Sequence, residues 1–477
     1  MGLVLLTERR AKQIAGLLSC YDRVIVQGTL PVFCYAEGMT AYLTKRRIRI
    51  FDFAQFAKPL TEAIRANAEQ LAADNGLAVD YVRKKNFRKE DRVKEVLRER
   101  GNHPGLVWIF SALEPCTTYQ PWHDKKSGRT YLRPDDGKCL HYYFYFIDEE
   151  LGLCYLRVPT WCPFRLQFYC NGHNWLARQL DQKKIGYRLL DNAFVAIDDW
   201  KLAQQIADSW DPSRLHRKLD EFAARYCPIL KQLEESYHWS LDEAEYATDI
   251  VFHRQADLQA IYGNLIRTAI HTVKPDDIAT FLGKKLNGNY QDEMGNRYNV
   301  RIEGTRVRHS MGMASIKMYD KFGHILRIET TTKDVSFFKH YRAVEQRNGE
   351  SVLKFAPMKK SIYSLGPCGN YSRPLTAAIW SFSRPSTIPA TASTSSTRSL
   401  APCTRRRALT GDSTFSITTT KRSFWPWPAG NSPSAGCKTR PCAPTSRSTA
   451  AARCPESSAG FAPTRWSKRR PTATSIT

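Results

Sequence analysis

A change in composition near Leu365 is the strongest constraint on what this chain can fold into. The 112 residues that follow it contain 19 Ser, 18 Thr and 13 of the 25 Pro, but only two acidic residues, Asp412 and Glu456. Such a segment buries too little apolar surface to offset the entropy that it would lose on ordering. We therefore expect a disordered, basic tail over 366–477 and a folded body over 1–365.

The tail also reads as a segment translated out of frame. Over Gly366–Trp380 the neighbouring frame permits an amphipathic helix that continues the body, and later stretches permit an Arg-rich helix followed by a basic hairpin. A helix followed by a hairpin is typical of a winged-helix module, in which the helix enters the major groove of DNA. The hypothesis is that a frameshift after about residue 365 has replaced a winged-helix domain.

Charge and apolar patterning narrow the class of protein. The body carries 55 Lys or Arg against 44 Asp or Glu, so it contributes +11 of the formal net charge of +25, and the tail contributes +14. No run approaches the roughly 18 apolar residues of a membrane span, and the opening MGLVLLTERR lacks a signal-peptide core. The eight cysteines of the body include no C-x-x-C pair. We expect a cytoplasmic protein with reduced cysteines and no membrane partner.

Residues 1–115 alternate strand-like and helix-like patterns. The expected strands cover 23–27, 48–53, 77–82 and 105–111, and the expected helices cover 54–75 and 89–100. Near-continuous apolar strands that alternate with helices are typical of a parallel sheet with helices on its faces. This range therefore predicts an α/β domain.

The rest of the body predicts a different arrangement. Residues 116–197 have the turn chemistry of an α+β region rich in β-hairpins, and 291–365 form a further β-hairpin unit. Between them, 198–290 shows helical periodicity, including a helix over 241–272. The predicted fold class is thus an α/β N-terminal domain followed by an α+β region with a long helical middle.

The final hairpin unit holds the densest group of candidate nucleic-acid-binding residues. Alternate residues of a strand share a face, so Lys317 and Lys321 point the same way as Tyr319. A surface that follows phosphates uses Arg and Lys with an aromatic ring nearby. The alternative is a solvated strand face whose charges pair across the strands. The candidate cations of this unit are Arg301, Arg306, Arg308, Lys317, Lys321 and Arg327.

A second candidate site lies at the predicted strand-to-helix junction near residue 85. The five cations are Arg83, Lys84, Lys85, Arg88 and Lys89, and an aromatic ring lies among them in the sequence. A helix N-terminus offers free N–H groups and positive potential to phosphate. The alternative is an ordinary solvated run of charge.

An enzyme is the alternative from a different class. Asp320 and Glu329, with His309, would hold Mg²⁺ beside a scissile phosphate in a metal-dependent nuclease or strand-transfer enzyme. A Tyr-Asp-Lys strand followed by an Arg-x-Glu strand resembles the arrangement in replication initiators of filamentous phages and plasmids. This resemblance adds Tyr319 to the catalytic candidates. The chain has no His-x-His pair, which initiators of the two-histidine type use to hold a metal.

The remaining metal-ligand candidates are scattered. His123, His141 and His173 are separated by 18 and 32 residues, spacings that predict nothing about proximity, so we expect no bound metal. The chain also has no Walker-type loop, dinucleotide fingerprint, H-E-x-x-H or G-x-S-x-G motif. We therefore expect no nucleotide cofactor.

Three long runs, over 139–177, 316–342 and 358–365, resemble a widespread bacterial family of hypothetical proteins that are often labelled for a MarR-like winged helix at the C-terminus. The resemblance implies DNA binding by intact relatives and supplies no catalytic residues. The leading hypothesis is a nucleic-acid-binding protein associated with a mobile element, with DNA favoured over RNA as its partner. The alternatives are the metal-dependent enzyme and a decayed, inactive gene product.

Overall fold

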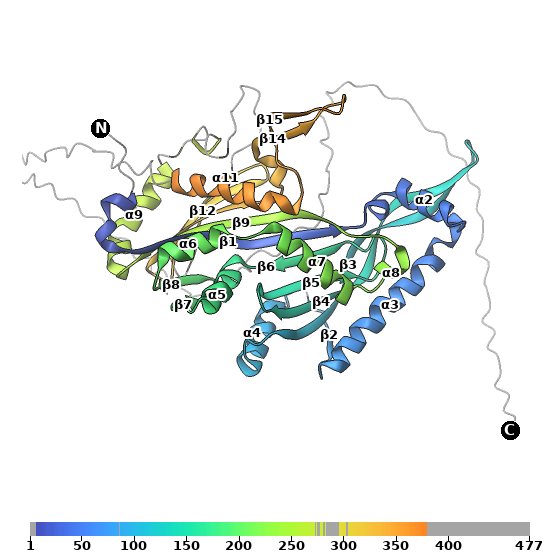
Figure 1. Ribbon diagram of the computed structural model, residues 1–477, viewed down its shortest axis with the longest axis horizontal. Helices are drawn as coiled ribbons and strands as arrows, with labels where there is room; N and C mark the ends of the chain where they lie inside the picture. The colour runs from blue at the N-terminus through green and yellow to red at the C-terminus, as the bar shows by residue number, and fades with distance from the viewer. Residues whose placement is uncertain are drawn as a thin grey trace, which may run out of the picture. The chain divides into compact units, whose positions relative to one another are not determined.

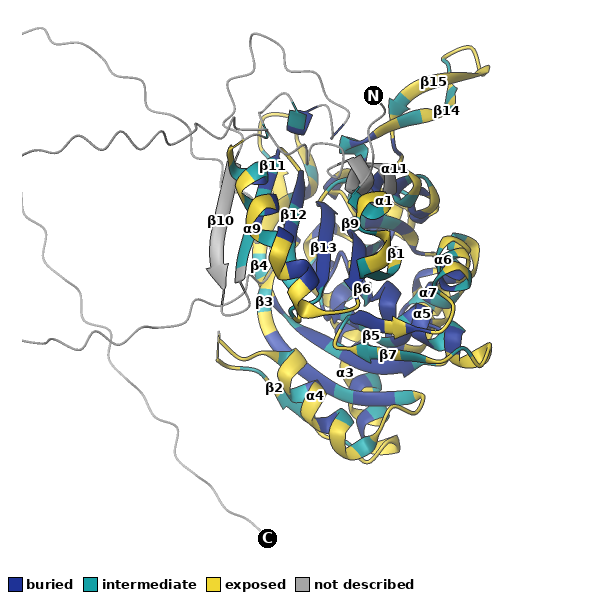
Figure 2. Ribbon diagram, turned by 90° about the vertical axis from the view of Figure 1, so that its left-hand side faces the viewer, coloured by how far each residue is buried: buried dark blue, intermediate teal, exposed yellow. Residues whose placement is uncertain are grey.

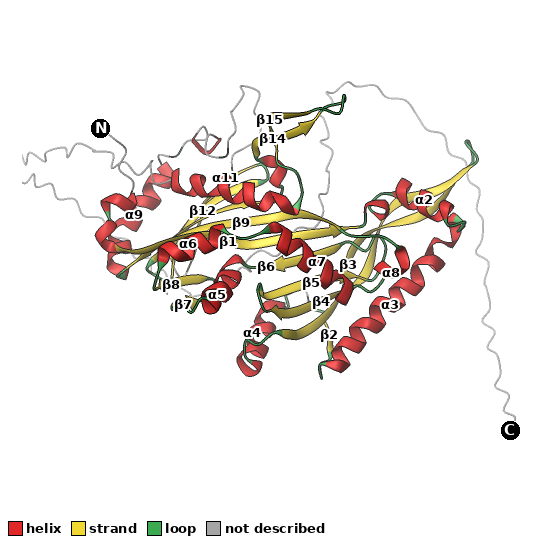
Figure 3. Ribbon diagram, viewed as in Figure 1, coloured by secondary structure: helices red, strands yellow, loops and turns green. Residues whose placement is uncertain are grey.

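The computed structural model describes residues 6–84, 86–271, 273, 277–279, 282, 295–301 and 304–378. Its main feature is an eleven-stranded sheet in the order β10-β11-β12-β13-β9-β1-β6-β5-β4-β3-β2 (Figures 1 and 3). In chain order these strands are β1 (Ile14–Thr29), β2 (Val79–Tyr81), β3 (Gly105–Asp124), β4 (Arg129–Asp148), β5 (Gly152–Pro159), β6 (Leu166–Cys170), β9 (His238–Phe252), β10 (Gly295–Arg301), β11 (Gly304–Met311), β12 (Ala314–Lys321) and β13 (Ile325–Thr332).

Helices and two small hairpins surround this sheet. The hairpins are β7 (Tyr187–Leu190) with β8 (Ala193–Ile197), and β14 (Lys339–Glu345) with β15 (Ser351–Pro357). The helices are α1 (Leu6–Arg9), α2 (Ala36–Lys45), α3 (Phe53–Asp74), α4 (Lys89–Arg100), α5 (Gly172–Gln182), α6 (Trp200–Asp208), α7 (Pro212–Tyr226), α8 (Leu230–Leu233), α9 (Gln255–His271) and α11 (Leu365–Ala378). The predicted mixture of helices and sheet is confirmed.

Almost all neighbouring strands of the sheet are antiparallel. Of the described strand pairs, only β2 and β3 run parallel, through the pairs from Val79 with Ile109 to Tyr81 with Ser111. The parallel pairing expected for 1–115 is thus found between β2 and β3, whereas β1 pairs antiparallel with β6 and β9. The expected strand at 48–53 is wrong, because residues Ile50–Asp52 form a 3-10 turn that leads into α3. The expected helices over 54–75 and 89–100 are confirmed as α3 and α4.

The long strand β9 corrects the expected helix over 241–272. Residues 241–252 are strand, and only α9 is helical in the described part of this range. Both edges of β9 are occupied, by β1 on one side and β13 on the other, so its backbone hydrogen bonds are completed between strands. This tertiary pairing overrides the local preference for helix, as it often does.

All four predicted ranges contribute to the same sheet. Strands β1, β2 and the first half of β3 come from 1–115, β4 to β6 come from 116–197, β9 comes from 198–290, and β10 to β13 come from 291–365. One continuous apolar core runs through them, because buried side chains from the first range to the last pack in a single cluster. The boundaries at 115, 197 and 290 therefore do not separate independent cores.

Aromatic packing fixes helices to the part of the sheet formed by β4 to β6. Tyr226 of α7 stacks on Phe144 and Phe146 of β4 with ring centroids 4.8 and 5.1 Å apart. On the other side of β3 and β4, α4 packs Val93 and Val96 into a smaller cluster. Figure 2 shows that the strands in the middle of the sheet are buried.

The outer half of the β3–β4 hairpin, residues 115–140, extends beyond the neighbouring strands, and we call it the arm. β3 and β4 pair along almost their whole length, but β5 pairs with β4 only from His141 onward. The helix α2 supports the arm, because the Thr40 hydroxyl of α2 accepts a hydrogen bond from the Leu132 backbone N–H at 3.0 Å. Just before this helix, the Phe33 carbonyl accepts from Tyr119 at 2.6 Å. The tip of the arm projects past α2 in Figure 1.

The fold continues past the composition boundary. Residues 365–378 form α11, with Leu365 and Cys368 buried and the Tyr21 hydroxyl donating to the Leu365 carbonyl at 2.5 Å. The expectation of a disordered tail is therefore wrong for 366–372, which continue the fold. Residues 379–477 lie outside the described residues. Within the described part of the chain, no helix is long and apolar enough to cross a membrane.

Removing α11 should destabilise the body. A chain that ends after Ser364 lacks the buried Leu365 side chain and the hydrogen bond from Tyr21, which together stabilise by about 2 to 4 kcal/mol. We expect it to unfold at lower urea concentration than a chain that ends after Ala378. Equal midpoints for the two chains would show that α11 does not support the sheet.

Candidate functional site

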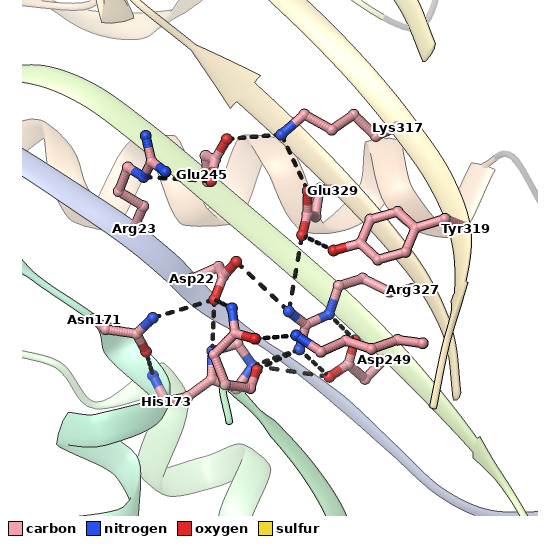
Figure 4. A network of polar contacts seen from close by, with 12 residues as sticks. Asp22, Arg23, Asn171, His173, Glu245, Asp249, Lys317, Tyr319, Arg327 and Glu329 are labelled. Carbon is pink, nitrogen blue, oxygen red and sulfur yellow. Dashed lines mark hydrogen bonds and ion pairs between the residues drawn. The ribbon is translucent and has the colours of Figure 1, made fainter. Parts of the chain in front are cut away.

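The densest group of polar side chains lies on one face of the sheet, and we call it the ionic cluster. It joins β1, β9, β12 and β13 to the start of α5 and to the turn between β7 and β8 (Figure 4). Most of its side chains are buried. Its members are Asp22, Arg23, Asn171, His173, Asn192, Glu245, Asp249, Lys317, Tyr319, Lys321, Arg327 and Glu329.

Strand register brings the cluster together. Lys317 lies opposite Glu329, and Tyr319 lies opposite Arg327, which in turn lies opposite Asp249 on β9. Opposite residues of an antiparallel pair share a face of the sheet, so these side chains converge. The prediction that Lys317, Tyr319 and Lys321 share a face fits this register.

A β-bulge adds two residues from β1. The register with β9 shifts between Tyr21, which pairs with Tyr246, and Arg23, which pairs with Glu245. Because the shift breaks strict alternation, the adjacent residues Asp22 and Arg23 both reach the ionic cluster. Bulges re-aim side chains in this way and are frequent near functional sites.

The start of α5 supplies the histidine. Asn171 caps the helix by accepting from the backbone N–H of His173 and donates to Asp22 at 3.2 Å. Gly172 lets the helix approach β1 closely, since a Cβ there would lie 2.3 Å from the Tyr21 carbonyl oxygen. His173 then lies between two carboxylates, with Nδ1 3.2 Å from Asp22 and Nε2 3.8 Å from Asp249.

Arg327 is the centre of the ionic cluster and is fully buried. Its Nε and Nη2 atoms each donate to an oxygen of Asp249 at 2.6 Å, a bidentate pair. Nη2 also donates to the Asn192 carbonyl at 2.6 Å, and Nη1 lies 3.5 Å from Asp22 and 3.8 Å from Glu329. Every side of the guanidinium therefore faces an acceptor.

The shifted pKa values follow from this arrangement. Burial alone would raise the pKa of Asp249, but Arg327 outweighs it and lowers the value to about 2. The pKa of Asp22 is lowered in the same way against burial, by Arg327 and then His173. Burial opposes the charged form of His173, yet Cys20, Asp22 and Asp249 raise its pKa well above the ordinary value. The carboxylates are thus ionised and matched by buried cations.

The upper part of the ionic cluster holds a tyrosine beside a carboxylate. Tyr319 donates to Glu329 at 2.5 Å, and Lys317 donates to Glu329 at 3.2 Å and to Glu245 at 2.8 Å. Burial, then the charge of Glu329, raises the pKa of Tyr319 well above its ordinary value. Tyr319 is therefore a protonated phenol whose hydrogen-bond acceptor is an anion.

These contacts correct the predicted phosphate-binding surface. Lys317 is paired with two glutamates, Lys321 bonds to Asn192, and Arg327 is enclosed by carboxylates. Lys317 and Arg327 neutralise acidic groups inside the protein, and the buried Lys321 donates to an amide, so these three cations do not form a surface open to phosphate. Arg306 and Arg308 on β11 are half-exposed, and the side chain of Arg301 lies outside the described residues.

The predicted catalytic residues are divided between the two faces of the sheet. Tyr319 and Glu329 meet in the ionic cluster. His309 lies in register with Ile316, and Asp320 directly follows Tyr319, so strand alternation places both on the face opposite the ionic cluster. Glu329 shares a face with Tyr319, whereas Asp320, the next residue of that strand, points to the other face, so the register does not bring Asp320 and Glu329 together to hold Mg²⁺.

The second predicted cluster is partly at the surface. Arg83, Lys84 and Arg88 are exposed, whereas Lys89 lies 3.5 Å from Glu114 and 3.5 Å from the centroid of the Tyr143 ring. Lys85 lies outside the described residues. Three of the five cations thus remain available to an external partner.

The three candidate metal-ligating histidines lie in different environments. His123 is on the arm next to Thr130, His141 is buried on β4 beside Cys139, and His173 belongs to the ionic cluster. Burial lowers the pKa of His141 to about 4. Among the residues that the structure describes, no group of three or more His, Cys, Asp or Glu side chains is arranged to hold a metal ion.

The tip of the arm is a functional candidate that the sequence reasoning missed. Its turn is closed by Asp124, which accepts from the Lys126 backbone at 3.0 Å and from Ser127 at 2.6 Å. Lys125, Lys126 and Arg129 are exposed around this turn. The available signal was the Ser-Gly turn between two long alternating runs, which predicts a hairpin.

An aromatic ring lies next to these cations. Trp122 is 43% exposed, and the guanidinium of Arg133 on the opposite strand lies 4.1 Å from the ring centroid. This cation–π contact presents a flat aromatic and cationic surface to solvent. The arm thus combines exposed charge with an exposed ring.

Comparison of the chain with protein-family models, with curated proteins and with solved structures found no match.

Replacing Arg327 tests the balance of the ionic cluster. Arg327→Met leaves Asp22 and Asp249 buried without their main cation, which should destabilise the fold by about 3 to 5 kcal/mol at pH 7. The exposed pair of Arg88 with Asp91 provides the control, and Arg88→Met should change stability little. Urea unfolding gives both values.

The pH dependence of this variant follows from the carboxyl pKa values. In the native cluster Asp249 stabilises the fold above its unfolded pKa of about 4 and loses this effect as the pH falls toward 2. Without the cation, burial raises the carboxyl pKa. Protonation then removes the buried unpaired charge and with it part of the destabilisation of the variant. The stability deficit of Arg327→Met should therefore shrink between pH 7 and pH 4, and a constant deficit would contradict the assignment.

Proposed function

We propose that this is a cytoplasmic nucleic-acid-binding protein that contacts double-stranded DNA with the arm. The observation that carries the proposal is the shape of the arm, a two-stranded ribbon that extends beyond its neighbouring strands and displays three exposed cations at its tip. The major groove of B-DNA admits a two-stranded β-ribbon, and exposed Lys and Arg contact phosphate.

The charge of the tip supports an anionic partner. Residues 121–133 contain Lys125, Lys126, Arg129 and Arg133 against one acidic residue, Asp124. The Asp124 carboxylate is used within the turn, where its hydrogen bonds from Ser127 and Lys126 lower its pKa. The cations therefore face solvent, whereas the Asp124 carboxylate accepts the hydrogen bonds that close the turn.

DNA fits this surface better than duplex RNA. The major groove of A-form RNA is too deep and narrow for side chains to read, whereas that of B-DNA is wide. Arg83, Lys84 and Arg88 add exposed charge near β2, and phosphate contacts of this kind strengthen binding without sequence preference. The same proposal includes association with a mobile element. It also includes the DNA-binding activity that the family resemblance implies.

Removing the cations of the arm should weaken DNA binding. Substituting Lys125, Lys126 and Arg129 by Ala together should lower affinity for all duplex sequences alike. It should also reduce the slope of log K against log salt by about three, because each of the three cations would neutralise about one phosphate. Filter binding over a range of salt concentrations measures both quantities.

The matched control removes the same charge elsewhere. Lys183, Lys201 and Arg217 are exposed residues of α5, α6 and α7, or lie directly after them, and their triple Ala variant should bind as the native chain does. Both variants keep the basic tail, so its contribution to binding is equal. Equal affinity and equal salt slope for the two triple variants would remove the arm from the proposal.

The hydrogen bond of Tyr319 to Glu329 favours a second candidate function, a nuclease or a strand-transfer or replication-initiation enzyme. A carboxylate next to a phenol can accept its proton while the phenol oxygen attacks phosphorus, which forms a phosphotyrosine bond, breaks the bond from phosphorus to one sugar oxygen and releases that sugar as a hydroxyl end. Lys317 and Arg327 supply positive charge nearby.

Incubating labelled single-stranded and duplex DNA with the full chain, with Mg²⁺ or with EDTA, tests this candidate. The enzyme predicts a cleaved or covalently attached product that Tyr319→Phe abolishes although DNA binding is unchanged. The binding proposal predicts no product with either strand form. A chain that neither binds nor cleaves matches the third hypothesis, an inactive gene product.

A further inference from the structure

Two cysteines lie side by side at the base of the arm. In the register of β3 and β4, Cys116 pairs with Gly137 and Glu114 pairs with Cys139, so the two cysteines share a face and are diagonal neighbours. Gly137 has no side chain that would separate them. Each thiol shifts the pKa of the other.

One of these thiols is open to solvent. A cavity of about 480 Å³ is lined by Cys116 and Cys139 together with Thr118, Trp161 and neighbouring residues. Cys116 is half-exposed, whereas Cys139 is buried, with 7% of its surface exposed. Among the described residues, only Cys34 and Cys116 are cysteines that are not buried. A small molecule in the cavity would therefore meet Cys116 first.

The surroundings give the two thiols different reactivity. The hydrogen bond from Cys139 lowers the pKa of Cys116 in spite of partial burial, and Arg157 adds to the effect. The same contact, followed by burial, raises the pKa of Cys139. A thiolate is the attacking form of cysteine, so Cys116 is the nucleophile and Cys139 is the resolving thiol.

We propose that Cys116 and Cys139 are a redox-active dithiol that low-molecular-weight disulfides oxidise. The Cys116 thiolate attacks one sulfur of the small disulfide, forms a mixed disulfide and releases one thiolate. Cys139 then attacks the Cys116 sulfur, displaces the second small thiol and closes the Cys116–Cys139 bond. In total the two protein thiols lose two electrons and two protons, and the small disulfide is reduced to two thiols.

Closing this bond would change the arm. Diagonal neighbours across an antiparallel pair have Cα atoms roughly 7 to 8 Å apart, whereas a disulfide requires about 4.4 to 6.8 Å. The two strands must therefore move together and twist. The pairing of β5 with β4 begins only at His141, and beyond it the Thr160 N–H donates to the Leu140 carbonyl, so the restraint on β4 from this side ends next to Cys139. An effect of this movement on DNA affinity would rest on the proposed function. The formation of the disulfide does not depend on the proposed function.

Mapping of disulfides in the full chain tests the dithiol. The native protein, without denaturant, is treated with oxidised glutathione, blocked with an alkylating agent, digested without reductant and examined by mass spectrometry. We expect a Cys116–Cys139 linked peptide that dithiothreitol removes. Cys34 is the internal control, since it is exposed and should carry only glutathione.

Two variants separate the steps. Cys139→Ser should retain glutathione on Cys116, because the resolving thiol is absent, and Cys116→Ser should leave the buried Cys139 unmodified. Glutathione on Cys34 with unlinked Cys116 and Cys139 in the native protein would overturn the proposal.

The mapping needs no DNA, so its result holds even if filter binding contradicts the role of the arm. If the arm binds DNA, oxidation should change the affinity of the native chain and leave that of Cys116→Ser unchanged.

Discussion

The ion pair between Arg327 and Asp249 is the contact on which the centre of this protein depends. A guanidinium that no solvent reaches is stable only if acceptors surround it, because the cost of removing a charge from water is several kcal/mol. Its acceptors come from β1, β9 and the turn between β7 and β8, and His173 of α5 contacts two of the same carboxylates, Asp22 and Asp249. The placement of these elements around β13 is therefore coupled to one side chain.

This arrangement separates two uses of positive charge. Inside the sheet, lysine and arginine side chains neutralise carboxylates and leave little capacity for an external anion. At the tip of the arm, cations of the same type face solvent beside an exposed Trp122. The body carries only a modest excess of positive charge, so the location of each cation matters more for binding than the total does.

Local patterns were sufficient where an element is defined by its own residues. The charged helix α4 was predicted with the bounds that the structure shows, and α3 was predicted to within one residue at each end. Prediction failed where distant partners decide. β9 resembles a helix in composition, and α11 lies in a segment of unfavourable composition, yet each is held by contacts with β1 and β13.

The same distinction applies to the candidate sites. Two-residue periodicity was enough to show that Lys317 shares a face with Tyr319 and that Arg327 shares one with Glu329, because alternation is a property of any strand. Whether that face is inside or outside was not encoded locally. It depends on Asp22, His173 and Asp249, which lie 78 to 305 residues from Arg327 along the chain and meet it only after β1, β9 and α5 have packed. Burial is a property of the assembled sheet, and so the chemistry of these charges was decided by tertiary structure.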